Sequence, residues 1–443
     1  MKLPAYPKYK PSGVEWLGSV PEHWKVKAIK WESPVLRGAS PRPIDDPRFF
    51  DDEGEFAWVR ISDVTTAGMY LETTEEKLST DGSSLSVKLN PGEIFLSIAG
   101  SVGKPCISRI KCCIHDGFVY FPRFKGEAKF LFYLFASGEP YRGLGKLGTQ
   151  LNLNTDTVGS IRMGCPEKAE QQAIAAFLDR ETGRLETLIG KKRQLIEKLK
   201  EKRTALISRT VTRGLNPNAK LKPSGIEWLG EIPAHWQSMP LKFIASVQPG
   251  FAFSSDDFID EGIPVVRIGD IISDGQIDFT NAKCLPEEFL GTNPDVIVQR
   301  GDIAMAMTGA TIGKVGRYGY EKPALLNQRV CLFRPNQGRS KDYLWYLLNS
   351  DFYIEHVELT AFGGAQPNIS ETQLLCCPVP VPPSSEQSAI ATYLDVETAK
   401  IDRLVEKVEA AIEKLLEYRT ALITAAVTGK IDVRGNAGVE PSN

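Results

Sequence analysis

The sequence predicts a duplicated protein of the α/β (α+β) class, with two domains in tandem and two long helices. The stretch KPSGVEWLGSVPEHW at residues 10–24 recurs as KPSGIEWLGEIPAHW at 222–236, and eleven of the fifteen positions are identical. A second stretch, EQQAIAAFLD at 170–179, recurs as EQSAIATYLD at 386–395. A period of about 212 residues is the size of a domain and far exceeds that of a solenoid repeat. The chain is therefore predicted to be a pseudo-twofold internal repeat.

The composition is that of an ordinary globular protein. The chain has 443 residues, of which 42% are hydrophobic and 24% are charged, and this length suffices for about two to four domains. No run of about 18 apolar residues could form a membrane helix, and the first residues lack an apolar secretory segment. We therefore expect a cytoplasmic protein that makes no membrane contact.

Charge and cysteine content restrict the function further. The net charge is -2, whereas an isolated DNA-binding domain is usually basic. A nucleic-acid role would therefore need local basic patches or partner subunits. The eight cysteines show no C-x-x-C spacing, so we predict reduced thiols and no metal site.

The middle blocks, residues 25–165 and 237–384, are predicted to be mixed α/β domains. Runs such as FAWVRI and FVYFP in the first block, and IPVVRI and VCLFRP in the second, are bounded by turn-forming residues, as strands are. The segments KFLFYLFAS and DYLWYLLNS are predicted to be short buried helices. Most residues differ between the blocks while the pattern persists, so the two domains share a fold and differ in detail.

Two proline-free segments, 170–213 and 386–434, carry a helical pattern. Apolar residues recur at alternating steps of four and three, which is typical of a coiled-coil seam. Their matching length and phase favour two helices of about 40 residues that pair with each other. Packing of each helix on a separate domain is the alternative. The predicted seam residues are Ile174, Leu178, Leu185, Leu188, Leu195, Leu199, Leu206, Ile390, Leu394, Ile401, Leu404, Val408, Leu415 and Leu422.

Motifs for catalysis are missing from the sequence. The glycine turns SIAGSVGKPC and MTGATIGKVG have the wrong spacing for a nucleotide-binding P-loop. They could instead touch a DNA phosphate or close a hairpin. No H-E-x-x-H, G-x-S-x-G or strand-linked G-x-G-x-x-G occurs. His23 and His235, each beside a tryptophan, suit packing or hydrogen bonding, and His115 and His356 stand alone. We predict a binding protein with no catalytic residue.

With these features in view, the chain resembles the specificity subunit of type I restriction-modification systems over nearly its whole length. The resemblance is carried by SGVEWLGSVPEHW and its second copy, by EQQAIAAFLD with EQSAIATYLD, and by RTALI followed by VT in both halves. It implies two target-recognition domains, each reading one half of a split double-stranded DNA sequence. It also implies that the two long helices separate these domains as an antiparallel coiled coil.

The resemblance implies partners as well. Two methyltransferase subunits would dock on the helices, and restriction subunits would join them. S-adenosylmethionine and ATP are expected on those partner subunits, and no cofactor is expected on this chain. The expected division of the chain is 1–24 for the first repeated segment, 25–165 for the first recognition domain, 166–214 for the central helix, 215–236 for the linker and second repeated segment, 237–384 for the second recognition domain, 385–432 for the C-terminal helix and 433–443 for a flexible tail.

Candidate DNA-binding residues occupy equivalent positions of the two domains. Arg, Gln and Asn can make bidentate hydrogen bonds to guanine or adenine, whereas Ser, Thr and Lys mostly contact phosphates. The alternatives are a structural pairing of Arg with Asp in RISD and RIGD, and capping of the next turn by an Asn. The candidates are Arg60, Ser101, Lys104, Gln150, Asn152, Arg267, Thr311, Lys314, Gln366 and Asn368.

Two other functions are considered beside DNA recognition. One is a coiled-coil scaffold that binds only proteins and reads no bases. The other is a fused DNA methyltransferase or nuclease, which the missing motifs disfavour.

Overall fold

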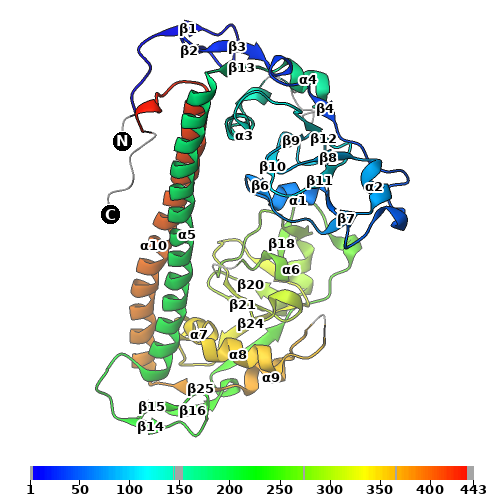
Figure 1. Cartoon of the computed structure of the whole chain (residues 1–443). Coiled ribbons are helices and arrows are strands. Elements are labelled where there is room, and N and C mark those ends of the chain that lie inside the picture. Colours follow the sequence, from blue (N-terminus) through cyan, green and yellow to red (C-terminus); the bar gives the residue numbers. More distant parts are fainter. Residues whose placement is uncertain (1–2, 143, 145–152, 273–274, 365–366, 437–443) are drawn as a thin grey trace. The chain divides into compact units, whose positions relative to one another are not determined.

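The computed structural model describes residues 3–142, 144, 153–272, 275–364 and 367–436 of the chain (Figure 1). Two compact units are present, one formed by 1–192 with 410–443 and the other by 193–409. We call them unit 1 and unit 2. Each long helix begins in one unit and ends in the other, so each unit holds the first part of one helix and the last part of the other.

Unit 1 contains a mixed α/β domain with two sheets. Its elements are β1 (Tyr9–Pro11), β2 (Ser19–Pro21), β3 (Lys25–Ala28), η1 (Ile29–Trp31), β4 (Leu36–Arg37), η2 (Pro47–Phe49), β5 (Phe56–Val59), α1 (Ile61–Thr66), β6 (Tyr70–Leu71), β7 (Glu76–Leu78), α2 (Thr80–Ser84), β8 (Val87–Leu89), β9 (Ile94–Ser97), β10 (Pro105–Ser108), β11 (Cys112–Ile114), β12 (Phe118–Tyr120), α3 (Ala128–Ala136), η3 (Glu139–Tyr141), α4 (Thr155–Ser160), β13 (Arg162–Cys165) and the C-terminal η9 (Arg434–Asn436). The sheet orders are β4-β12-β9-β10-β6 and β7-β5-β11-β8. Phe95 and Phe118 of the first sheet share a buried cluster with Val59 and Ile114 of the second, so the two sheets enclose one core.

Unit 2 repeats this plan. Its elements are β14 (Leu221–Pro223), β15 (Glu231–Pro233), β16 (Gln237–Pro240), η4 (Leu241–Phe243), β17 (Ala245–Pro249), η5 (Ser255–Asp257), β18 (Ile263–Val266), η6 (Ile268–Asp270), β19 (Lys283–Leu285), α6 (Glu288–Thr292), η7 (Pro294–Val296), β20 (Ile297–Val298), β21 (Ile303–Ala306), η8 (Gly309–Thr311), β22 (Val315–Arg317), β23 (Ala324–Leu326), β24 (Val330–Pro335), α7 (Lys341–Leu348), α8 (Asp351–Thr360), α9 (Glu371–Cys376) and β25 (Pro378–Val381). The sheet orders are β17-β24-β21-β22 and β19-β18-β23-β20. The predicted α/β class is confirmed for both halves.

Each domain is closed by one antiparallel strand pair. β3 pairs with β13, with Val26 opposite Gly164, and β16 pairs with β25, with Met239 opposite Val379. The chain therefore enters and leaves each domain side by side, next to the start of a long helix. A domain attached in this way is a module that can vary without altering the helix it precedes.

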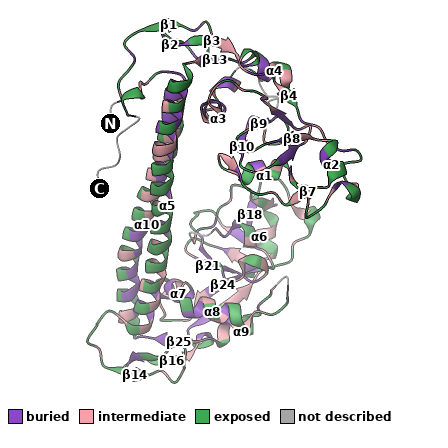
Figure 2. Ribbon diagram, viewed as in Figure 1, coloured by how far each residue is buried: buried purple, intermediate pink, exposed green. Residues whose placement is uncertain are grey.

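The two long helices are α5 (Lys168–Arg213) and α10 (Ser384–Val427). They lie side by side and run in opposite directions (Figure 1). Their facing sides are buried and their outer sides are exposed, as Figure 2 shows. The prediction of two helices that pair with each other is confirmed, and so is the antiparallel arrangement that the resemblance implied.

The seam between the helices differs from the predicted one at alternate positions of the four-and-three pattern, where the next residue along the helix lies in the seam instead. Leu188, Leu195 and Leu404 are 41%, 45% and 49% exposed, so these three residues do not lie in the seam. The residues that follow the first two, Ile189 and Ile196, are buried instead. Among the other predicted seam residues, seven are buried and four are half-buried: Ile174, Leu178, Leu185, Ile390, Leu394, Ile401 and Leu422, then Leu199, Leu206, Val408 and Leu415.

At other such steps, polar side chains occupy the inner positions. Thr182 and Thr398 are buried on the inner side, where each hydroxyl donates to the carbonyl oxygen four residues earlier, at 2.6 and 2.7 Å. Arg203 and Arg419 also lie on the half-buried inner side, in ion pairs with the other helix. The regular steps of the pattern miss these positions and pass through the adjacent residues, which are Glu181, Lys202, Glu397 and Tyr418. A satisfied polar group can nevertheless be buried at small net cost.

Candidate nucleic-acid interface

Four chain segments of unit 2 meet at one end of the sheet β17-β24-β21-β22. The first follows β17, the second precedes β24, the third connects β21 to β22, and the fourth follows α8. Backbone hydrogen bonds tie them together: Gln328 donates to Phe251, Met307 to Arg329, and Ile369 to Met307, at 2.9, 2.9 and 3.1 Å. The result is one continuous row of loop residues, in which Phe251, Gln328 and Arg329 are exposed whereas Met307 and Ile369 are buried.

Unit 1 forms the corresponding part of such a row among its described residues. Ala39 donates to Ile114 at 3.1 Å, and Ile98 donates to Gly117 at 2.8 Å. Gly38 occupies the close approach between two of these loops, because a side chain there would overlap the carbonyl oxygen of His115. Burial lowers the pKa of His115, and its ring nitrogen accepts from the Gly117 amide at 2.9 Å. The imidazole therefore shapes the turn.

The two candidate arginines lie at the same end of their domains but are engaged in ion pairs. Arg267 forms an ion pair with Asp270 at 2.9 Å, and its backbone amide at the start of η6 donates to the same carboxylate at 2.8 Å, which matches the structural alternative. Arg60 pairs with Glu76 at 2.6 Å, while its backbone amide donates to Asp63 at 2.7 Å. The two arginines hold strand ends in place, and contact with DNA would require them to exchange these partners.

The candidates in the glycine turns lie near these arginines. The turns that carry Ser101 and Lys104, and Thr311 and Lys314, connect β9 to β10 and β21 to β22, so they close hairpins. The Ser101 hydroxyl lies 3.0 Å from that of Thr65, and the Lys104 ammonium donates to the Thr65 carbonyl. Lys314 is exposed. The Thr311 hydroxyl oxygen is buried and has no hydrogen-bond partner among the described residues. The turns thus bring an ammonium group to the loop row of each unit.

Three candidates, Gln150, Asn152 and Gln366, lie outside the described residues. Asn368 is described, and its backbone pairs with Phe362 and with Thr308 in the loop row. The helix that follows is capped by Ser370, whose hydroxyl accepts from the Gln373 amide, so Asn368 does not cap it.

Several residues of the two rows were missed by the sequence reasoning. In unit 2 they are Phe251, Gln328 and Arg329, and in unit 1 they are Arg42 and Asp116. Arg42 and Asp116 form an ion pair at 3.1 Å. The available signal was a short polar turn between two strands, HDG in one half and NQR in the other.

The repeated segments are fastened to the long helices by a buried carboxylate. Glu170, in the first turn of α5, accepts from Tyr6 at 2.8 Å and from Trp24 at 3.1 Å, and its second oxygen lies 2.8 Å from His23 Nε2. Burial and the bond to Glu170 raise the pKa of Tyr6 well above its ordinary value. A carboxylate at this position also interacts favourably with the N-terminal end of the helix dipole.

Unit 2 repeats the same contact. Glu386, in the first turn of α10, accepts from Trp236 at 2.9 Å and lies 2.7 Å from His235. The two histidines are therefore hydrogen-bonding groups, as predicted. The duplicated Trp-rich segment and the duplicated EQ pair are two sides of one contact, which is why they recur together.

Metal-binding clusters and membrane-spanning helices are both absent from the described residues. Residues 3–142, 144, 153–272, 275–364 and 367–436 contain no cluster of three or more His, Cys, Asp or Glu side chains that could hold a metal ion. Over the same part of the chain, no helix has both the length and the apolar character needed to cross a membrane.

The fold defines a protein in which two similar α/β domains are attached by equivalent contacts to one antiparallel helix pair. A family model described as type I restriction modification DNA specificity domain matches residues 21–198 and 233–414. The chain belongs to this family of type I DNA specificity subunits, which are non-catalytic within the restriction-modification complex.

Known relatives agree with this assignment. The MjaVIII specificity subunit of Methanocaldococcus jannaschii is 26% identical over 433 residues, which is 94% of each chain. The EcoBI specificity subunit of Escherichia coli is 28% identical over 48% of this chain and 43% of its own. A solved chain from a study of type I complex assembly and conformational transition superimposes with a TM-score of 0.70, at 17% identity over 93% of this chain and 99% of its own. The HsdS subunit of Thermoanaerobacter tengcongensis superimposes with a TM-score of 0.50, at 16% identity over 93% and 98%.

Proposed function

We propose that the chain reads a bipartite DNA target, with each domain recognising one half-site, and that the helix pair carries two methyltransferase subunits. The observation that carries the proposal is the twice-built contact of Glu170 and Glu386. This contact supports a design in which two independent domains are attached in the same way to the helix pair, which acts as their common spacer. A protein built in this way can present two different reading surfaces to one DNA molecule.

The loop rows support the DNA-reading part of the proposal. Each lies at one end of one sheet of its domain and carries arginine with hydroxyl or amide side chains. Such groups contact phosphates and base edges. The net charge of -2 of the whole chain supports dependence on partner subunits for tight DNA binding.

The exposed leucines of the helices support the methyltransferase part. Leu188 and Leu195 are seven residues apart on α5, and Leu404 occupies on α10 the position equivalent to Leu188. Apolar residues at heptad spacing outside the seam suit contact with a further helix of another subunit. Because the positions are equivalent, two identical subunits could dock with pseudo-twofold symmetry.

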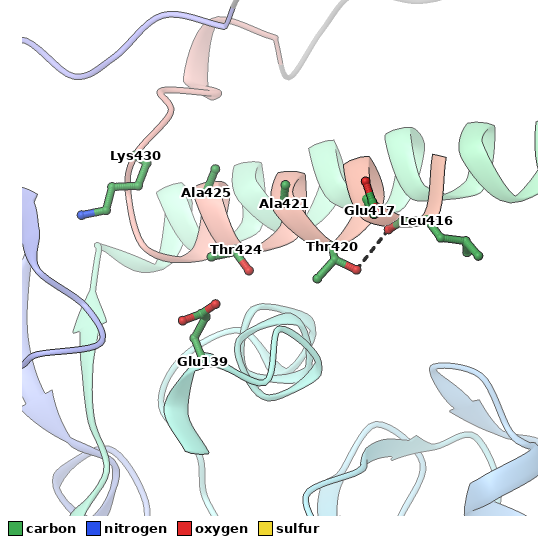
Figure 3. Close-up of a pocket in the computed structure, with 8 residues that line it drawn as sticks. All are labelled: Glu139, Leu416, Glu417, Thr420, Ala421, Thr424, Ala425 and Lys430. Carbon is green, nitrogen blue, oxygen red and sulfur yellow. Dashed lines mark hydrogen bonds between the residues drawn. The ribbon is translucent and has the colours of Figure 1, made fainter. Parts of the chain in front are cut away.

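Unit 1 also has a groove beside α10. Its volume is about 700 Å³, and Leu416, Ala421 and Ala425 contribute to its lining (Figure 3). Glu139 and Lys430 lie on its borders, as Figure 3 shows. Small side chains on the helix would let a partner helix approach closely.

The partner subunits would carry out the catalysis. S-adenosylmethionine would be bound by the methyltransferase subunits, and ATP by restriction subunits that join the same complex. This chain would supply the position of those enzymes on DNA.

Mapping of methylated positions would test the proposal. Genomic DNA would be exposed to the full chain with its methyltransferase subunits, and the modified sites would be sequenced. One split motif is expected. Methylation without sequence preference would favour a scaffold that only binds proteins, and methyl transfer by the isolated chain would favour a fused methyltransferase.

A further inference from the structure

The loop row of unit 2 has a defined order and length. Backbone pairing places Phe251 beside the turn of Gln328 and Arg329, that turn beside Thr308, Thr308 beside Asn368, and Asn368 beside Phe362. Four neighbouring spacings of about 4.8 Å give about 19 Å. At 3.4 Å per base step, this length covers about five or six base pairs, which is less than one turn of DNA.

The charge of the row differs from that of the chain. The segments 250–253, 307–314, 327–329, 361–364 and 367–369 contain Arg329 and Lys314 and no acidic residue, although the chain has a net charge of -2. The row itself therefore carries a formal charge of +2, from Arg329 and Lys314, which suits an approach to phosphates.

Arg329 is available for a ligand. Its side chain is exposed and has no hydrogen-bond or ion-pair partner among the described residues. By contrast Arg267, Arg300 and Arg317 are each paired with a carboxylate. Gln328 is exposed next to Arg329.

Large aromatic side chains stand at the two ends of the row. Phe251 is 48% exposed and Phe362 is 59% exposed. Exposed phenylalanine costs solvation free energy in the free protein, and a DNA ligand would cover it, because apolar side chains can contact thymine methyl groups in the major groove.

We propose that the row from Phe251 to Phe362 is the base-reading strip of unit 2. Arg329 reads a guanine and Gln328 an adenine, and the two phenylalanines make the apolar contacts at the ends of the half-site. This inference rests on the proposed function and adds the residues that select the bases of one half-site.

The same strip in unit 1 has different chemistry. Gly117 stands where unit 2 has Arg329, and Asp116 stands where it has Gln328. The Asp116 carboxylate accepts from Arg42 and from Ser40, both at 3.1 Å. Unit 1 therefore lacks the free guanidinium of unit 2 at this point, so the two half-sites differ in sequence.

The test uses the full chain in complex with its methyltransferase subunits, with sequencing of methylated sites and binding measurements at several salt concentrations. Arg329→Ala should relax one base pair of one half-site, with on the order of a 10- to 100-fold loss of discrimination there, and leave the other half-site unchanged. Arg329→Lys keeps the charge but loses the bidentate fork, so it should lose the same discrimination. Phe251→Ala and Phe362→Ala should relax positions at the two ends of the same half-site.

Matched controls lie at the opposite end of the strands. Arg339 follows β24 and Tyr320, 43% exposed, follows β22, and Arg339→Ala and Tyr320→Ala should leave both half-sites unchanged. The inference is overturned if Arg329→Ala weakens binding equally for all sequences and lowers the salt slope by about one, because that is the behaviour of a phosphate contact. It is also overturned if discrimination is unchanged. A wild-type complex without any split motif would instead refute the proposed function.

Discussion

Arg203 of α5 donates from Nε to Asp402 Oδ1 of α10 at 2.9 Å, and Arg419 of α10 pairs with Glu186 of α5 at 3.0 Å. Arg419 stands 216 residues after Arg203, and Asp402 stands 216 residues after Glu186. The ion pairs are thus two copies of one contact, with the roles of the helices exchanged. This exchange is what a pseudo-twofold axis between antiparallel helices produces.

The ion pair of Arg203 with Asp402 should stabilise the folded protein. Arg203→Glu and Asp402→Arg alone should each lower the free energy of unfolding, and the double variant should recover part of the loss. Because the Arg203 and Asp402 side chains are 27% and 48% exposed, we expect a coupling free energy of about 0.5–1 kcal/mol. Urea unfolding of the four proteins would measure it, and strictly additive losses would show that the side chains do not interact.

The two glutamates that fasten the repeated segments should contribute unequally. Glu170 is buried and accepts from Tyr6 and Trp24, whereas the Glu386 side chain is 41% exposed and has no tyrosine donor among the described residues. Glu170→Ala should therefore cost about 3 kcal/mol of unfolding free energy and Glu386→Ala about 1 kcal/mol. Urea unfolding would measure both variants, and equal costs would contradict the argument.

The exposed leucines should each serve one methyltransferase subunit. Leu188→Asp or Leu404→Asp should leave the fold intact, because both side chains are exposed, and should reduce the complex from two bound methyltransferase subunits to one. Native mass spectrometry would count the subunits. Leu85→Asp, at a residue that is 52% exposed and far from the helices in sequence, is the control and should retain two. Two bound subunits in every variant would place the docking surface elsewhere.

The parts of the fold that the sequence predicted are those that occur twice. Glu170 with Trp24 and Glu386 with Trp236 form one contact written in both halves, so a comparison of the halves revealed the segments without any knowledge of their pairing. The helices were predictable for the same reason, since their patterns match in length and phase.

The seam and the loop rows were less accessible. Thr182 and Arg203 lie on the inner side because their polar groups find partners there, and no count of apolar residues contains that information. Arg329 and Phe251 become neighbours through strand order and register. Neither strand order nor register can be derived from sequence spacing.

The helix pair should act as a ruler between the two half-sites. Inserting seven residues in each helix, after Lys192 and after Val408, keeps the alternation of four and three and adds about 10.5 Å. This should lengthen the unread gap by about three base pairs and leave both half-sites unchanged. Methylation mapping would show the gap, and insertion in one helix only should disrupt the pair. An unchanged gap would mean that the helices do not set the distance.

Residues 1–216 should form a symmetric reader by themselves. The helix α5 of a second copy can take the place of α10, because it offers similar residues at the equivalent positions. Leu206, Ile207, Thr210 and Val211 would replace Leu422, Ile423, Ala426 and Val427 in the core of unit 1.

The ion pair should be re-formed in the same dimer. Arg203 of one copy would meet Glu186 of the other, since Glu186 stands 216 residues before Asp402. Seam lysines such as Lys192 make this pairing weaker than the native one, so we expect dimerisation at about micromolar concentration or with methyltransferase bound. The target of such a twofold dimer should be an interrupted palindrome built from the first half-site. Light scattering and methylation mapping would test this, with Arg203→Glu weakening the dimer and Glu186→Arg added to it restoring the contact. A fragment that stays monomeric with methyltransferase bound, or that methylates a non-palindromic site, would show that the two halves are not equivalent.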